Sequence, residues 1–488
     1  MRIAEIQWGD DSAEKDPFLL EYFVTSDAFH RIRRKTKGMV IGRKGSGKSA
    51  LRKKLEQEFQ SEPHTLVVNE SPKYNAIKAV LNERDIVTTF GHEIFFQYTW
   101  LRQISLDCLC VAGHSGKGKY VTESLEFARK ISLELNRTSK DFVENVADVL
   151  SKIKAKAGDL GEFGLQIEKE LRSVADLDAL EHHLFQIAQS GLEFVVLIDD
   201  LDLGWDNSPA ANNMLLGLLA ATNYISGKSH HIFPCTFLRE DVYSILVSHT
   251  QHSDKYRNVE RIRWEKDDLL NILNERINFN RSRNNLPPLP NPFASVFPEA
   301  IGTSNTENWL VERTLGRPRE LIQLARYYTE AVDSTTPDVD LLKAAEGPYS
   351  SWKLDDLCAE YSNQYPGLIS IFSYWKTKFF RHKYHLQRRE IEEMLLQVAS
   401  DVEVNAPWWN NIIDNTDIEA LLKLLYEIGF LGDFILGGEG GSKTFYSYIE
   451  RHEPRFEEVQ IHPCFRRSVN TVERIRNRKE DVTTIATG

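Results

Sequence analysis

The sequence has few cysteines, no long apolar run and no excess of positive charge, and each absence excludes a class of protein. Its five cysteines form no Cys-x-x-Cys pair, so neither a zinc knuckle nor a disulfide framework is indicated. The apolar runs fall far short of the ~20 residues that cross a bilayer. The start of the chain is acidic rather than a basic leader. We therefore expect a cytoplasmic protein without a membrane partner.

Charge and motif content narrow the function further. A net charge of −11 disfavours a general affinity for nucleic acid, although a local basic patch remains compatible with it. The chain has no Asn-Lys-x-Asp element after a strand, which disfavours a GTPase, and no nuclease or protease constellation. Its 488 residues are enough for about two to four domains with packed cores.

What the sequence does contain is a complete phosphate-binding pattern at residues 42–49, Gly-Arg-Lys-Gly-Ser-Gly-Lys-Ser. The pattern follows the apolar run Met39–Ile41 and precedes a helix-like stretch. Lys48 is expected to reach the β- and γ-phosphates of ATP, and the Ser49 hydroxyl to bind Mg²⁺. The predicted nucleotide contacts from this segment are Gly42, Arg43, Lys44, Gly45, Ser46, Gly47, Lys48, Ser49 and Ala50.

A second apolar run is followed directly by acidic residues. A nucleotide-binding site of this kind needs such a carboxylate to hold its Mg²⁺ ion. Residues 194–198 are Phe-Val-Val-Leu-Ile, typical of a buried parallel strand, and Asp199 and Asp200 follow. Asp199 is predicted to hold Mg²⁺ through water. Asp200 or Asp202 is predicted to orient the attacking water, with a turn or helix N-cap as the equally weighted alternative for Asp202.

The order of elements predicts the α/β class, with a P-loop NTPase parallel sheet as the core. Five strands are expected near residues 39–41, 65–69, 194–198, 231–238 and 259–264. A mostly helical insertion occupies about 85–190, within a P-loop ATPase core assigned to residues 1–265.

The rest of the chain predicts a helical lid at 266–347 and a C-terminal domain at 348–488. Four helical segments followed by two β-like runs, 430–436 and 443–449, indicate a winged-helix-like domain. Its candidate recognition helix, 416–427, is acidic, which disfavours a groove-reading role. DNA therefore stays a possible partner, while contact with another protein or with the ATPase core is favoured.

Two arginines lie where they would sense a nucleotide. Arg239 ends the strand 231–238, where a cation stabilises transferred charge; pairing with a neighbouring acid is the equally weighted alternative. Residues 315–322 form a turn that opens a helix, with Pro318 near its start and arginines positioned to face an anion.

Taken together, these motifs resemble the AAA+ and STAND group of P-loop ATPases over roughly residues 17–330, with the insertion excluded. The resemblance implies that Arg319 is a sensor on the lid and that Pro318 touches the base. The loop sequence is also similar to bacterial P-loop ATPases that accompany defence systems. Asp200 departs from the glutamate usual in AAA+ enzymes, which implies slow hydrolysis.

The resulting expectation is an ATP-binding conformational switch or assembly motor subunit that acts on a protein partner or on copies of itself. A DNA-associated AAA+ loader and a non-hydrolysing nucleotide-binding scaffold are the alternatives. Strong salt dependence of DNA binding would favour the first. Tight ATP binding without phosphate release would favour the second.

Overall fold

The computed structural model divides the chain into two compact units, one formed by Asp10–Arg263 and the other by Met1–Gly9 together with Trp264–Gly488. The structure describes residues 1–71, 92–115, 122–135, 146, 148–149, 151, 172–173, 175–202, 204–250, 256, 258–438, 441–449 and 452–472.

The unit Asp10–Arg263 is built on a five-stranded parallel sheet, as the apolar runs predict. Its strands are β1 (Met39–Gly42), β2 (Thr65–Glu70), β3 (Glu193–Ile198), β4 (Ile232–Arg239) and β5 (Glu260–Arg261). They are hydrogen-bonded in the order β2-β3-β4-β1-β5. The class is therefore mixed α/β, and β3 is almost completely buried, as expected for a strand covered on both faces.

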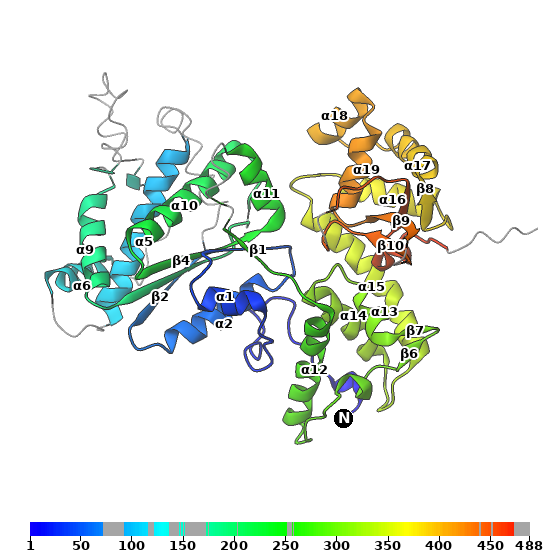
Figure 1. Cartoon of the computed structure of the whole chain (residues 1–488), viewed down its shortest axis with the longest axis horizontal. Helices are drawn as coiled ribbons and strands as arrows, with labels where there is room; N and C mark the ends of the chain where they lie inside the picture. Colours follow the sequence, from blue (N-terminus) through cyan, green and yellow to red (C-terminus); the bar gives the residue numbers. More distant parts are fainter. Residues whose placement is uncertain are drawn as a thin grey trace, which may run out of the picture. The chain divides into compact units, whose positions relative to one another are not determined.

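Helices cover both faces of this sheet (Figure 1). On one face lie α1 (Asp27–Arg33) and α2 (Lys48–Gln60); on the other lie α5 (His92–Ser115), α9 (Leu177–Gln189), α10 (Pro209–Lys228) and α11 (Glu240–His249), with α6 (Glu123–Leu135) packed against α5. The described part of the predicted insertion is thus helical.

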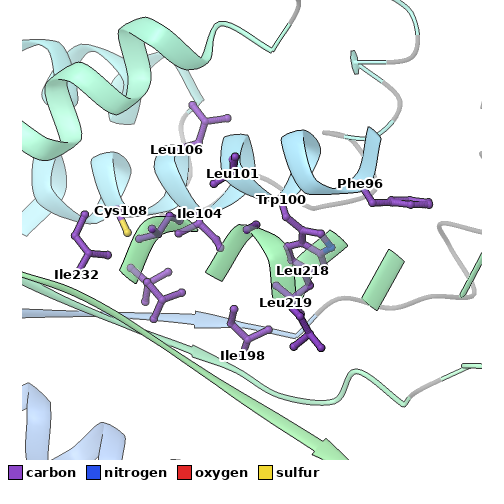
Figure 2. Close-up of a cluster of buried hydrophobic side chains, with 14 of the residues drawn as sticks. Phe96, Trp100, Leu101, Ile104, Leu106, Cys108, Ile198, Leu218, Leu219 and Ile232 are labelled. Carbon is purple, nitrogen blue, oxygen red and sulfur yellow. The ribbon is translucent and has the colours of Figure 1, made fainter. Parts of the chain in front are cut away.

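The main core of this unit forms where α5 and α10 pack over the sheet (Figure 2). Trp100 and Ile104 of α5 meet Leu218 and Leu219 of α10, above Ile198 of β3. The Trp100 indole Nε1 donates a hydrogen bond to the carbonyl of Met214 at 3.1 Å, which satisfies its polar atom inside the core.

The backbone of α10 lies directly against α5 at Gly217, and this contact gives a stability prediction. A Cβ atom at this position would lie 2.6 Å from Cβ of Phe96 and 2.7 Å from the backbone nitrogen of Gln97. Gly217→Ala should therefore lower the free energy of unfolding by about 1–3 kcal/mol, because the helices must move apart. Urea unfolding measures this. Gly227→Ala is the control, since a Cβ there meets open space; equal stability of the two variants would contradict the prediction.

The direction of the strand connections reverses at the neighbouring strands β1 and β4. From β1 the chain passes through α2 to β2, on the far side of β4 and β3, whereas from β4 it passes through α11 to β5, beyond β1. The two connections leave in opposite directions on opposite faces of the sheet (Figure 1). Open α/β sheets bind ligands at such a point.

The second unit begins with helices α12 (Lys266–Arg283), α13 (Thr306–Val311), α14 (Pro318–Ala331) and α15 (Val339–Glu360), with a short hairpin of β6 (Ala300–Ile301) and β7 (Ser304–Asn305). The first nine residues of the chain also pack here rather than with the sheet. Trp8 Nε1 donates to Thr329 Oγ1 at 2.8 Å, and the Gln7 backbone exchanges two hydrogen bonds with the Asn280 side chain. The assignment of residues 1–265 to one core therefore differs from the structure at Met1–Gly9.

The remainder of this unit combines helices with a four-stranded antiparallel sheet, ordered β10-β9-β11-β8. Its elements are α16 (Leu368–Lys378), β8 (His385–Gln387), α17 (Arg388–Asp401), α18 (Pro407–Asn415), α19 (Ile418–Glu427), β9 (Leu431–Gly438), β10 (Gly441–Phe445), β11 (Glu458–Ile461) and α20 (Pro463–Arg466). The predicted boundary at 347/348 falls inside α15. The division into a lid and a winged-helix-like domain stays a prediction.

All five cysteines are buried and free of disulfides, and burial raises the pKa of Cys110 and Cys358 to about 12, as expected for packing residues rather than nucleophiles. None of the helices in the described ranges combines the length and apolar character needed to span a bilayer.

Candidate nucleotide-binding site at the sheet edge

The pairing of the strands brings the predicted site residues of the first unit together. Gly42, the last residue of β1, lies in register beside Arg239, the last residue of β4. On the other side of β4, Ile198 of β3 pairs with Thr236, and Asp199 follows at the carboxyl edge. The phosphate-loop pattern, the acids and Arg239 thus occupy the carboxyl edge of the sheet, where the direction of the strand connections reverses.

The loop between β1 and α2 depends on its glycines. Gly45 and Gly47 have φ angles of 78° and 95°, in the left-handed region that favours glycine. At Gly42 the constraint is space, because a Cβ atom would lie 2.4 Å from the Ser46 hydroxyl. The loop leads directly from β1 into α2, so this helix begins at the carboxyl edge of the sheet, and the first N–H groups of a helix have no partner within it.

Lys48 reaches back over this loop. Its ammonium donates hydrogen bonds to the carbonyls of Gly42 at 2.9 Å and Arg43 at 3.2 Å. Burial lowers the pKa of Lys48, while the carboxylates of Asp202 and Asp199 act in the opposite direction. A phosphate between the Lys48 ammonium and the start of α2 would stabilise the charged form of this buried lysine. The arrangement therefore suits an anion.

Asp199 is the acid best suited to hold a metal ion. Its side chain is 5% exposed, and its Oδ2 atom is buried without a hydrogen bond from any described residue. Burial raises the pKa of Asp199, and Lys48 and Arg52 offset part of that rise. A buried carboxylate oxygen with free acceptor capacity, on the same sheet edge as the start of α2 and its Ser49 hydroxyl, fits a hydrated Mg²⁺ ion.

The neighbouring acid, Asp200, is held in an unusual backbone conformation with φ at 59°. Its Oδ2 accepts a hydrogen bond from Ser71 Oγ at 2.7 Å, directly after β2. The carboxylate therefore lies at the same edge as Asp199, with one oxygen engaged by a hydroxyl.

Arg239 is paired with acids at the end of β4. Its guanidinium contacts Asp241 through Nε at 3.1 Å and Nη2 at 2.6 Å, and Nη1 lies 3.5 Å from Asp202 Oδ2. The alternative considered from sequence, pairing with a neighbouring acid, is thus observed. Asp202 lies in a turn rather than at the N-cap of α10, which is Ser208. The catalytic roles of both residues stay predictions.

Pro318 and Arg319 belong to the other unit, at the start of α14. Arg319 Nη1 lies 3.5 Å from Asp356 of α15, and its guanidinium lies 5.6 Å from the Trp352 ring centroid. Next to Arg319, a buried network of ion pairs joins α14 to α15. Its members are Arg317, Glu320, Lys353, Asp356 and Glu360. The sensor role of Arg319 and the base contact of Pro318 remain predictions.

Two site residues were not found from the sequence. Arg52 lies one helical turn beyond Lys48, and its Nε is 3.4 Å from Asp199 Oδ2; Ser71 binds Asp200. The position of Arg52 could have been predicted, because it lies four residues after Lys48 and residues i and i+4 of a helix share a face. Ser71 had no pattern of its own, and only the pairing of β2 with β3 brings it to Asp200.

Comparison with known proteins adds a family for part of the chain and a distant relative for most of it. Residues 267–358 match the FunZ-associated C-terminal helical domain, which spans α12 to nearly the end of α15. The chain is also 22% identical, over 492 aligned residues, to the putative transposon gamma-delta 80.3 kDa protein of Escherichia coli (strain K12). The similarity covers 94% of this chain and 66% of that relative. The chain thus contains a FunZ-associated helical domain and is a weak homologue of a protein named for a transposon.

Proposed function

We propose that the unit Asp10–Arg263 is a P-loop ATPase that binds ATP with Mg²⁺ and hydrolyses it slowly, as a conformational switch or assembly motor subunit. The observation that carries the proposal is the position of Lys48, whose ammonium spans the carbonyls of the glycine loop at the head of α2. An idle lysine at a surface turn would extend into water instead.

In this proposal each residue has a task that its position supports. The loop amides and the start of α2 bind the phosphates, and Lys48 exchanges its carbonyl partners for phosphate oxygens. Ser49 and Asp199 hold Mg²⁺, which neutralises charge on the phosphates when bound. Asp200 orients the attacking water, and Arg239 would leave Asp241 to stabilise the transferred charge.

Slow hydrolysis is proposed because the two residues expected to act in it, Asp200 and Arg239, are bound to other side chains. Asp200 is hydrogen-bonded to Ser71, and Arg239 is bound to Asp241 through two hydrogen bonds. Both must leave their partners before they can act, so the resting site is not arranged for fast chemistry. A protein partner or a second copy that rearranges the edge of the sheet would raise the rate.

Thermal unfolding of the whole chain tests the proposal. A ligand that binds only the folded state stabilises it by about 2.7 kcal/mol at one hundred times its dissociation constant. Magnesium with ATP should therefore raise the unfolding temperature, and magnesium with GTP should raise it less. If millimolar ATP left the unfolding curve unchanged, the proposed function would be wrong.

The output of the switch is proposed to be contact with protein rather than DNA. The helix–strand–helix–helix–helix order from α16 to α19 and the β9–β10 hairpin that follows support a winged-helix-like domain. Two of its arginines are paired with acids, since Arg388 pairs with Glu392 and Glu419 and Arg389 pairs with Glu393. With α19 acidic as well, the local charge gives little attraction for phosphate backbones.

Arg319 is proposed to report the nucleotide state, and Arg319→Ala tests this. Its partner Asp356 keeps Lys353 at 3.3 Å, so the variant should remain folded. We expect nearly unchanged ADP affinity, ATP affinity about 5- to 100-fold weaker, and loss of the ATP-dependent change in shape. Small-angle scattering with an ATP analogue and with ADP measures the last effect. Identical profiles for the two nucleotides in the unmutated protein would rule out the switch.

A further inference from the structure

A second cation of α2 lies against the acid proposed to hold the metal. Arg52 Nε is 3.4 Å from Asp199 Oδ2, and the two side chains are 15% and 5% exposed. Both atoms are buried, and neither forms a hydrogen bond with any described residue. The contact is therefore an electrostatic attraction without hydrogen-bond geometry, which is easier to break than a bidentate pair.

Arg52 also has other acceptors within reach. Its Nη1 lies 3.5 Å from Glu56 Oε2, one turn further along α2, and 3.4 Å from Asn69 Oδ1 near the end of β2. These distances are long, so no single partner fixes the guanidinium. If Arg52 left Asp199, its charge would still face a carboxylate and an amide oxygen rather than an apolar surface.

We propose that Arg52 is a placeholder cation, which neutralises Asp199 while no metal is bound and shifts toward Glu56 and Asn69 when Mg²⁺ arrives. The inference rests on the metal site of the proposed function. The reason is electrostatic. The Arg52 guanidinium and a metal ion would both lie against the buried Asp199 carboxylate, and they repel each other strongly because little water screens their charges there. Arg52 therefore keeps the empty site stable and lowers its affinity for metal.

The charge-removing variant Arg52→Gln tests this, with Mn²⁺ as the probe. Glutamine keeps much of the side chain and removes the charge. Titration of the whole chain with Mn²⁺, followed by electron paramagnetic resonance, should give about tenfold tighter binding in Arg52→Gln, with ATP and without it. Arg52→Lys keeps the charge and should stay close to the unmutated protein.

Lys54→Gln is the matched control, because it removes the same charge from the same helix at a surface pair with Glu58. Its Mn²⁺ affinity should match that of the unmutated protein. Equal or weaker Mn²⁺ binding in folded Arg52→Gln would overturn the proposal, as would equal tightening in Lys54→Gln. If Arg52→Gln failed to fold, Arg52→Lys would decide, since a large change in its Mn²⁺ affinity would contradict a role that depends on charge.

The failure of this inference is distinguishable from failure of the proposed function. Tighter Mn²⁺ binding in Arg52→Gln without ATP binding by any variant would support the placeholder and reject the nucleotide site. Normal ATP binding with the same Mn²⁺ affinity in both proteins would reject the placeholder alone.

Discussion

Lys48→Ala should abolish nucleotide binding at ordinary ATP concentrations, with a loss of affinity of about 30-fold or more. The variant removes the ammonium that spans the Gly42 and Arg43 carbonyls, leaving the phosphates with the loop amides and the start of α2. Calorimetry with ATP and Mg²⁺ measures the loss. Truncating one partner of a buried charge pair costs about 2–5 kcal/mol, which corresponds to this range.

The control for this experiment is Lys54→Ala, which removes a lysine of the same helix whose partner is Glu58. It should bind ATP like the unmutated protein. Circular dichroism shows whether Lys48→Ala keeps its helices. A folded Lys48→Ala protein with undiminished affinity would mean that the glycine loop does not bind phosphate.

The second large effect is expected from the two acids after β3, which should separate metal binding from turnover. Asp199→Ala should remove the dependence of ATP binding on Mg²⁺ and stop hydrolysis, because the buried Oδ2 acceptor is lost. Asp200→Asn should keep binding and slow phosphate release by about 100-fold or more, since an amide cannot accept the proton of the attacking water. The measurements are ATP affinity at several Mg²⁺ concentrations and single-turnover phosphate release.

Asp202→Asn is the control that tests whether Asp200, and not Asp202, orients the attacking water. Its carboxylate lies 3.5 Å from Arg239, so the variant should alter turnover only modestly by loosening that contact. If Asp202→Asn alone stopped phosphate release while Asp200→Asn did not, Asp202 would be the residue that orients water, and Asp200 would serve only its bond to Ser71.

The parts of the site that depend on local sequence were predictable. The segments near 39–41, 65–69, 194–198, 231–238 and 259–264 were predicted as the five strands of the sheet, and the spacing of glycines, Lys48 and Ser49 placed the loop at the carboxyl end of β1. The acid after β3 followed from the same reasoning, since a parallel strand presents its carboxyl end to the ligand edge.

The parts that depend on long-range packing were not predictable. Met1–Gly9 pack against α12 and α14, which lie more than two hundred residues away in the chain, and no periodic pattern marks that contact. Arg52 and Ser71 reach the acids only because α2 and β2 lie beside β3. The short strands β8 and β11 were also missed, because three or four residues are too few to show the alternation of polar and apolar residues that marks a strand.

Arg319 illustrates a related limit. Its place at the start of a helix after Gly316 predicted an anion sensor, and the structure shows in addition that it lies beside Asp356 and Trp352, next to a buried ionic network. Sequence patterns identify the start of a helix but not the carboxylates that a neighbouring helix brings to it.

The central claim is that ATP and Mg²⁺ bind at the loop of Gly42–Ser49, and calorimetric titration of the whole unmutated chain tests it most directly. We predict one ATP site per chain with micromolar or tighter affinity in Mg²⁺, and weaker binding when the metal is chelated, because Asp199 and Ser49 then lose their link to the phosphates. No measurable heat and no competition by ADP at millimolar nucleotide would contradict the account.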